Sequence, residues 1–502
     1  MEEISKTQES RLPRSLWRII NYPRLTVGIC LALAAVAFFF SVHLSLVFVS
    51  LSYIFVAYYV ERRNLDAFIL PPLSIFAVAN FFGGSLAPFL LAEDIYSQVF
   101  DAILITHLVS TATFLVLILI YWMVNRHNPP VVILDAGTMP KVLKGYRFRF
   151  IAFSILAFAV ILEYMLISSG VADRGRAGDI ILETRYGFWS YFVAFAKLEY
   201  IAFLLIPYAY VSSRRLTKYS IISLLIVYSM FQLANSNRGG LLFPFVFIVV
   251  GYWMVGGSFK RVFASFAFLI VVMFLLTPIL GAFRGSGALE TTDLKDVGSR
   301  IRLLVENHGE GWGGGGVFYD AGNVVGRAML GCNDPIIYAD TPDTIPFAGW
   351  ERFEGVLYLW MPNMFFPDKP SLLDGDYIRE LYTGIHNERS SITISYSADL
   401  YRRFGWTGVF LGYPFYALAI SFFVRYGVRN AARKTTRLWG LMVLFFVTTF
   451  IHGVPFGSLL AMIWNFFYDY PKYLLVLWGL VFMSRLLFKE PQLESIGQYN
   501  SL

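Results

Sequence analysis

The chain has 502 residues, of which 57% are hydrophobic and only 15% are charged. A soluble globular domain has closer to a quarter of its residues charged, so this composition excludes an ordinary soluble protein. The net charge of +7 would suit nucleic acid, but the basic residues are dispersed between apolar segments, so we expect no nucleic-acid partner. The two cysteines, Cys30 and Cys332, exclude a disulfide framework.

Long apolar segments run through most of the chain. A membrane-spanning helix needs about 20 apolar residues, and about 12 segments approach that length. In chain order they cover residues 24–41, 43–60, 66–91, 100–124, 149–168, 187–211, 219–235, 240–255, 262–282, 405–424, 438–455 and 471–487. The first two form one uncharged stretch that must fold back near Ser41–His43. The sequence therefore predicts an all-α polytopic membrane protein.

Basic residues orient these predicted spans. With the N-terminus in the cytoplasm, the inner segments contain more than half of the 41 Lys and Arg residues, and the short outer loops 92–99 and 456–470 contain none. This distribution follows the positive-inside rule, so we expect both termini in the cytoplasm. Basic flanks and a second span directly afterwards argue against Leu25–Phe40 being a cleaved signal peptide.

The spans divide the chain into five regions. Residues 1–23 are a cytoplasmic N-terminus, and residues 24–282 are a bundle of about nine spans. Residues 283–404 contain no uncharged run long enough to span, so they form a large, mainly helical loop on the outer side. Residues 405–487 are the C-terminal spans, and residues 488–502 are a cytoplasmic tail.

Arginines gather in the outer segments, where the positive-inside rule disfavours them. Arg174, Arg176 and Arg185 lie in the loop 169–186, Arg238 lies in a tight turn, and Arg284 directly follows the ninth span. Planar guanidinium groups bind phosphate through two parallel hydrogen bonds, so the set favours a phosphate-bearing substrate at the outer face. For each arginine alone, snorkelling or a local pair with an aspartate stays open as the alternative.

The large loop offers His386 as its candidate base, in the stretch Thr-Gly-Ile-His-Asn-Glu-Arg. A neutral imidazole can take a proton from an attacking sugar hydroxyl. Arg389, Arg402 and Arg403 could steady a pyrophosphate leaving group. A solvated loop histidine is the alternative. The chain has no HExxH motif and its six histidines lack metal-ligand spacing, so we expect neither metal nor cofactor. The apolar, aromatic stretch 354–366 is predicted to lie on the membrane surface or to pack on the bundle.

Four short stretches of the sequence resemble a known family. Asn237-Arg238-Gly239 resembles the Ser-Arg-Gly signature of Wzy-type oligosaccharide repeat-unit polymerases and the related O-antigen ligases. Tyr401-Arg-Arg-Phe-Gly-Trp-Thr-Gly-Val409 resembles the segment through which these proteins return to the membrane, and His386-Asn387 is similar to a His-Asn pair of the ligases. Arg284 resembles another of their outer arginines.

The resemblance implies a fold of the glycosyltransferase-C kind in a bacterial inner membrane, with the large loop in the periplasm. It implies a metal-independent polymerase of undecaprenyl-pyrophosphate-linked oligosaccharides that makes O-antigen, capsular or exopolysaccharide. Arg238 and Arg284 would hold the pyrophosphate, Arg176 or Arg185 would close over it, and His386 would be the general base. The candidate partners are this lipid-linked substrate, membrane lipid, a chain-length regulator and a flippase.

Other functions stay open from the sequence. An O-antigen ligase would transfer finished polymer to a different acceptor with the same chemistry. A lipid-linked oligosaccharide flippase would be a transporter rather than an enzyme, although transporters tend to have internal repeats and the two halves show none that is convincing. A cell-wall glycan polymerase would share the chemistry but not the motifs.

Overall fold

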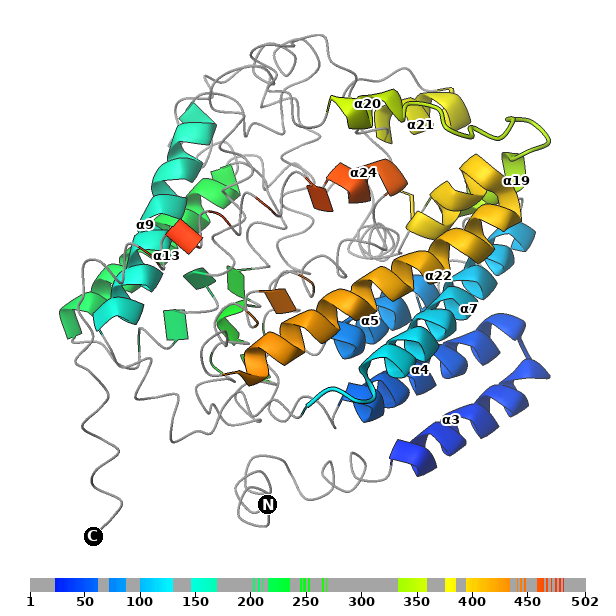
Figure 1. Ribbon diagram of the computed structural model, residues 1–502, viewed down its shortest axis with the longest axis horizontal. Coiled ribbons are helices and arrows are strands. Elements are labelled where there is room, and N and C mark those ends of the chain that lie inside the picture. The colour runs from blue at the N-terminus through cyan, green and yellow to red at the C-terminus, as the bar shows by residue number, and fades with distance from the viewer. Residues whose placement is uncertain are drawn as a thin grey trace, which may run out of the picture. The chain divides into compact units, whose positions relative to one another are not determined.

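The computed structural model describes residues 23–61, 72–86, 100–129, 146–168, 215–234, 333–358, 375–384, 394–433 and 458–464. Single residues and short pieces between 202 and 268 and between 440 and 482 are also described. All regular elements in this part of the chain are helical (Figure 1). The chain forms two compact units. The first combines Met1–Leu134 with Gly313–Tyr468, and the second combines Asp135–Trp312 with Asp469–Leu502.

Within the described residues, three helices are long and apolar enough to cross a membrane: Val42–Glu61, Asp101–Asn125 and Tyr396–Asn430. They correspond to the predicted spans 43–60, 100–124 and 405–424. The predicted spans 24–41, 149–168 and 219–235 also coincide with helices. The predicted spans 187–211, 240–255, 262–282, 438–455 and 471–487 lie largely outside the described residues.

Helices α3 (Pro23–Phe38) and α4 (Val42–Glu61) form an antiparallel hairpin in the first unit. The chain turns over residues 39–41, at the predicted fold-back, and Arg24 at the start of α3 donates a hydrogen bond to Tyr59 Oη near the end of α4. The buried face of α3 contains the small residues Cys30, Ala34 and Ala37, which let apolar helices approach closely. Its other face exposes large apolar side chains, as a lipid-covered surface does.

Helix α5 (Pro72–Phe81) continues into the π-helical turn η1 (Phe82–Leu86), where the sequence predicted one span over 66–91. Two close contacts fix this turn against its neighbours. Ser85 Oγ donates a hydrogen bond to Ser50 Oγ of α4. A Cβ on Gly84 would lie 2.5 Å from Ser110 Oγ of α7 (Phe100–Asn125), so a larger residue would push that hydroxyl aside.

Polar contacts join the apolar helices at both ends of this bundle. Glu61 accepts hydrogen bonds from the amides of Leu73 and Ser74, which open α5, and from Tyr121 Oη of α7. The carboxylate thus satisfies amides that a helix start leaves without intrahelical partners. Nearer the other end, His43 Nδ1 and His107 Nδ1 lie 3.3 Å apart, joining α4 to α7.

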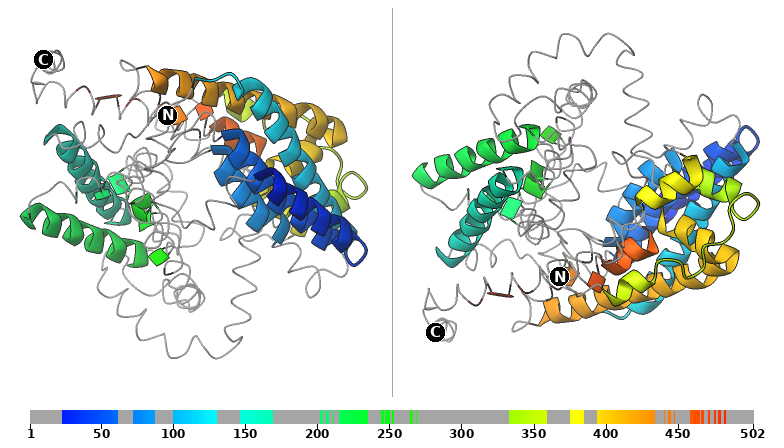
Figure 2. Two further views of the ribbon diagram at one scale, coloured as in Figure 1. Left: turned by 90° about the horizontal axis from the view of Figure 1, so that it is seen from below. Right: turned by 90° about the horizontal axis from the view of Figure 1, so that it is seen from above.

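Helix α22 (Tyr396–Ala432) packs along α7, and the two helices lie side by side in Figures 1 and 2. Its 37 residues would extend about 55 Å, nearly twice the hydrocarbon core of a bilayer. The helix breaks at Gly405, which has φ 63° and ψ −156°. Only the part after Gly405 is of bilayer length. The sequence predicted a span from this residue, and the structure adds a short helical segment before it, Tyr396–Phe404.

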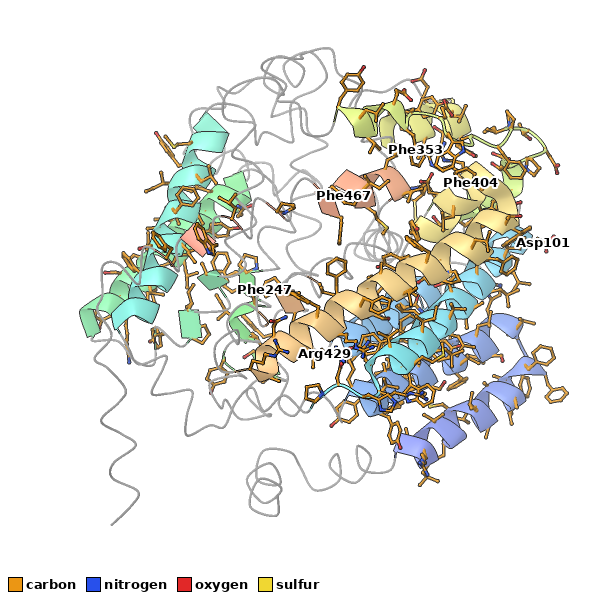
Figure 3. All side chains as sticks on the ribbon, viewed as in Figure 1. Asp101, Phe247, Phe353, Phe404, Arg429 and Phe467 are labelled. Carbon is orange, nitrogen blue, oxygen red and sulfur yellow. The ribbon has the colours of Figure 1, made fainter. Side chains whose placement is uncertain are left out.

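Asp101 and Phe404 lie at one end of the α7–α22 pair, and Arg429 lies at the other end (Figure 3). The short helices α19 (Asp334–Asp340), α20 (Glu354–Leu357), α21 (Gly375–Thr383) and α24 (Leu459–Trp464) complete this unit. Of these, α19 packs on both α7 and α22 and also contacts α21, and α24 contacts both α20 and α22. The described part of the predicted outer loop therefore packs on the helices rather than forming a separate domain.

In the second unit, α9 (Tyr146–Ser168) packs against α13 (Arg215–Ala234). Tyr164 and Phe231 join the two helices, with ring centroids 5.9 Å apart. Tyr228 also contacts Phe203, from the predicted span 187–211, with its ring centroid 4.9 Å away. These contacts place three predicted spans next to one another.

Candidate functional site

A buried charge cluster lies at the start of α22, and we call Asp399, Arg402 and Arg403 the Asp399 cluster. Asp399 Oδ1 accepts from Arg402 Nε at 2.9 Å and pairs with its Nη2 at 2.8 Å. Asp399 Oδ2 accepts from Arg403 Nε at 3.1 Å and from the amide of Leu459 in α24 at 2.8 Å. The spacings i, i+3 and i, i+4 put both arginines on the helix face of the aspartate. Since a buried charge is costly unless paired, this carboxylate supports both guanidinium groups.

The break at Gly405 allows a contact with the described part of the predicted outer loop, residues 333–358 and 375–384, which we call the outer segment. In a continuous helix the carbonyls of Arg402 and Arg403 would accept from amides four residues later. Here they accept hydrogen bonds from the amides of Ala348 and Gly349, both at 3.0 Å. Arg403 strengthens this join, because its Nη1 donates to the carbonyls of Gly349 at 3.3 Å and Glu351 at 2.8 Å. The turn 348–353 is thus fixed to α22 through both backbone and side chain.

Asp334 ties α19 to the first turn of α22. Its Oδ1 accepts a hydrogen bond from the Ser395 amide at 2.8 Å, and Ser395 Oγ in turn caps α22 by accepting from the Ala398 amide. Burial raises the pKa of Asp334 to about 7, although the hydrogen bonds from Ser395 oppose that shift. This carboxyl group is therefore expected to titrate near neutral pH.

An aromatic cluster covers the same junction. Tyr338 of α19 stacks on Trp406 with an interplanar angle of 10° and ring centroids 6.0 Å apart. The ring centroid of Tyr401 lies 4.7 Å from that of Trp406. Tyr401 Oη also donates to the carbonyl of Thr341. Phe347 fills the space beside Gly405, where a Cβ would lie 3.1 Å from its ring. The residues of the return segment 401–409 therefore have structural partners in the outer segment.

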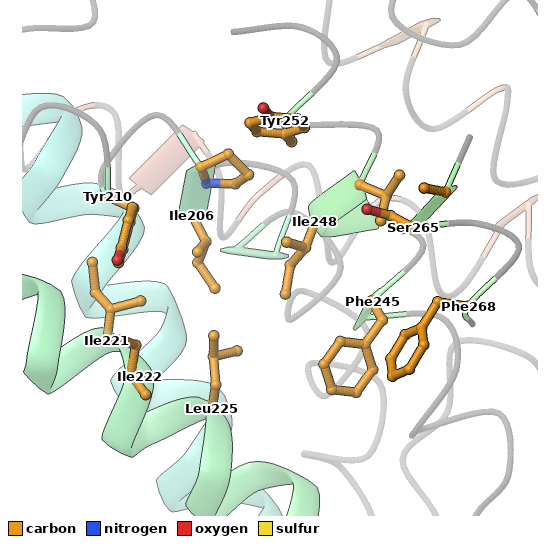
Figure 4. Close-up of a pocket in the computed structure, with 13 residues that line it drawn as sticks. Ile206, Tyr210, Ile221, Ile222, Leu225, Phe245, Ile248, Tyr252, Ser265 and Phe268 are labelled. Atoms are coloured by element: carbon orange, nitrogen blue, oxygen red, sulfur yellow. The ribbon is translucent and has the colours of Figure 1, made fainter. Parts of the chain in front are cut away.

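The second unit contains an apolar cavity of about 950 Å³ (Figure 4). Its lining comes from four predicted spans: 187–211, 219–235, 240–255 and 262–282. Leu225, Phe245 and Ile248 are among the side chains that face it, and Tyr210, Tyr252 and Ser265 bring its few polar atoms. A cavity of this chemistry suits a hydrocarbon chain rather than a sugar or a phosphate.

Arg402 and Arg403 are predicted site residues that the structure describes. Both belong to the Asp399 cluster, and each has only 1% of its surface exposed. The remaining predicted residues lie outside the described part of the chain: Arg176, Arg185, Arg238, Arg284, His386 and Arg389. Their arrangement therefore stays a prediction.

Two acidic residues at the junction were not predicted as important. Asp399 has a sequence signal that could have identified it, because Arg402 and Arg403 follow it at helical pairing distances. Asp334 has no such sequence signal, because its partner Ser395 lies 61 residues away. The aromatic segment from residue 354 was expected on the membrane surface or on the bundle, and its described start, α20, contacts α24.

Among the described residues, no three His, Cys, Asp or Glu side chains lie together as metal ligands would. Comparisons with family models, with curated proteins and with solved structures gave no match. The function must therefore be inferred from the chemistry of the residues and from the geometry above.

Proposed function

We propose that the chain is a metal-independent glycosyltransferase that polymerises undecaprenyl-pyrophosphate-linked oligosaccharide repeat units. The proposal includes about 12 spans of the glycosyltransferase-C kind in a bacterial inner membrane, with the large loop in the periplasm. The product would be O-antigen, capsular polysaccharide or exopolysaccharide. The resemblance of the motifs at Arg238, Arg284 and 401–409 supports the same class.

One observation carries this proposal: arginines flank the spans that line the apolar cavity. Arg185 directly precedes the span 187–211, Arg238 precedes 240–255 and Arg284 follows 262–282, all on the predicted outer side. Residues from these three spans line the cavity. Arginines at the predicted outer ends of spans that line an apolar cavity would match the two ends of a prenyl pyrophosphate, which is anionic at its head and hydrocarbon along its tail.

The depth of the cavity favours a long tail. Phe245 and Ile248 lie seven or more residues past Arg238, which is about 10 Å or more along a helix. Tyr210 and Tyr252 lie near the predicted cytoplasmic ends of their spans. A lipid whose head is held at the outer arginines would need to extend deep into the membrane to fill this space, as undecaprenyl does.

The reaction would be a transfer between two lipid-linked chains. The acceptor sugar hydroxyl attacks the anomeric carbon of the donor, the bond from that carbon to the pyrophosphate oxygen breaks, and His386 takes the hydroxyl proton. Arg238 and Arg284 neutralise the leaving pyrophosphate, with Arg176 or Arg185 closing over it. An O-antigen ligase would use the same step with another acceptor, so the nature of the product separates these two enzymes.

The proposal is tested in cells that lack the native gene and express single variants. Arg238→Ala and Arg284→Ala should abolish long-chain polysaccharide while the protein still inserts in the membrane. Arg215→Ala is the matched control, because Arg215 opens α13 on the predicted cytoplasmic side and should leave chain length unchanged. Normal chain length in both outer variants would contradict the proposal.

A further inference from the structure

An exposed aromatic surface on the outer segment has no role in the mechanism above. We call Trp350, Glu351, Arg352 and Tyr377 the Trp350 face. Trp350 is 71% exposed, more than the other tryptophans whose exposure the structure describes. It lies outside the helices that are long and apolar enough to cross a membrane. One exposed indole does not by itself mark a binding surface, so the way the ring is held and the groups that surround it decide whether it is one.

The indole is held in a fixed orientation. Phe353 and Phe404 pack against it edge to face, with ring centroids 4.9 Å and 5.1 Å away. The preceding residue, Gly349, donates its amide to Arg403 O, and Arg403 Nη1 donates to the carbonyl of Glu351 directly after it. A ring already fixed by its neighbours loses little conformational entropy when a ligand stacks on it.

Polar groups surround the ring in an arrangement that suits hydroxyl groups. Tyr377 Oη donates to Glu351 Oε1, and the Arg352 guanidinium lies 5.1 Å from the centre of the Tyr377 ring. An ionised carboxylate has about four lone-pair sites, so Glu351 can accept further hydrogen bonds from hydroxyl groups. The face therefore combines a flat apolar platform with hydrogen-bonding groups at its rim.

The charge of the described surface around the Trp350 face disfavours anionic ligands. Four exposed carboxylates lie on the described stretches 333–358 and 375–384: Asp343, Glu351, Glu354 and Glu380. The arginines of these stretches are half-buried Arg352 and buried Arg379. An acidic surface is repelled by anionic lipid headgroups and by pyrophosphate, and an uncharged ligand is not.

We infer that the Trp350 face binds uncharged sugar residues of the glycan chain, away from its pyrophosphate end. The C–H groups on one face of a sugar ring pack on the indole, while the sugar hydroxyls bond to the carboxylate and guanidinium at the rim. This inference rests on the proposed function for the identity of the glycan. Binding of the glycan chain at this face would keep the product near the enzyme, so the face favours longer products.

The test uses the full-length protein in nanodiscs of neutral lipid. The probe is the lipid-free oligosaccharide released by mild acid from the lipid-linked intermediates of the host, and binding is measured by calorimetry. Trp350→Ala should weaken binding about ten-fold, as expected for the loss of an aromatic anchor, and Trp350→Phe should retain part of it. Leu357→Ala removes a neighbouring exposed apolar side chain and should leave binding unchanged.

Equal affinity of wild type and Trp350→Ala would overturn the inference, and so would an equal loss in Leu357→Ala, which would indicate a displaced segment or a membrane contact. Polymerisation is measured separately in the same nanodiscs. Activity of the wild type with no effect of Trp350→Ala on binding would reject the sugar site and leave the proposed function intact. Trp350-dependent binding in a protein that does not polymerise would reject the proposed function and retain the site.

Discussion

Asp399 balances two buried arginines with one carboxylate, so its removal leaves both guanidinium groups buried without that counterion. Breaking a buried ion pair in this way costs about 3–5 kcal/mol. We therefore expect Asp399→Ala to lower the thermal unfolding midpoint of the detergent-solubilised protein strongly. Asp343→Ala removes an exposed carboxylate of the same outer segment and is the control. Equal midpoints for the two variants would contradict the structural role of the cluster.

Asp334 makes the free energy of unfolding depend on pH. Burial raises its pKa from 3.8 to about 7, so the folded protein binds more protons than the unfolded chain between these values. The free energy of unfolding therefore falls as pH rises through that window. Asp334→Asn keeps the acceptor for the Ser395 amide and removes the charge. The variant should unfold at a higher temperature than wild type near pH 8 and lose part of the decline between pH 4 and 8, as followed by intrinsic fluorescence. An identical pH profile in wild type and variant would show that Asp334 does not titrate in this way.

At the scale of elements, the break in α22 depends on Gly405. Its φ of 63° and ψ of −156° belong to a region that is essentially restricted to glycine, and other residues there cost about 1–3 kcal/mol. A Cβ would also press on Phe347 at 3.1 Å. Gly405→Ala should therefore lower the unfolding midpoint and expose the turn 348–353 to proteolysis. Gly28→Ala in α3, where a Cβ meets nothing within 4 Å, should do neither.

The apolar cavity gives a prediction about the lipid substrate. Leu225→Trp on α13 would fill part of the cavity, whereas Ile226→Trp on the same helix alters a side chain that is 56% exposed. If the cavity holds the prenyl tail, Leu225→Trp raises the KM for the undecaprenyl-linked donor about ten-fold and affects a short-prenyl donor less. Equal KM values for the two variants would place the tail elsewhere.

For the molecule as a whole, the sequence predicts the helices far better than it predicts how they pack against one another. Uniformly apolar stretches such as 43–60 and 100–124 predict helices of bilayer length, because a helix in a bilayer satisfies its own backbone hydrogen bonds. The fold-back near Ser41 could be predicted because no bilayer is thick enough for residues 24–60 as one span. The break at Gly405 within a longer helix could not, since the carbonyls before it bond to the amides of Ala348 and Gly349, which are distant in the sequence.

For the candidate site, the sequence predicts which functional groups could take part but not how they are arranged. Arg402 attracts interest because guanidinium groups bind phosphate, and the sequence alone cannot show that Asp399 and burial engage it. That outcome depends on Leu459 and on residues 348–351, which are more than 50 positions away in the sequence. The exposure of Trp350 depends on the same packing. Composition and spacing identify candidate groups, and tertiary contacts decide which of them face a ligand.

The central claim, polymerisation of lipid-linked repeat units, is tested most directly with purified protein in proteoliposomes. Undecaprenyl-pyrophosphate-linked repeat units are the sole substrate, and products are separated by length. We predict a ladder of glycans in steps of one repeat unit, with release of undecaprenyl pyrophosphate and no added metal, and no ladder with Arg238→Ala. Repeat units that remain unchanged, or that cross the bilayer without being joined, would contradict the account.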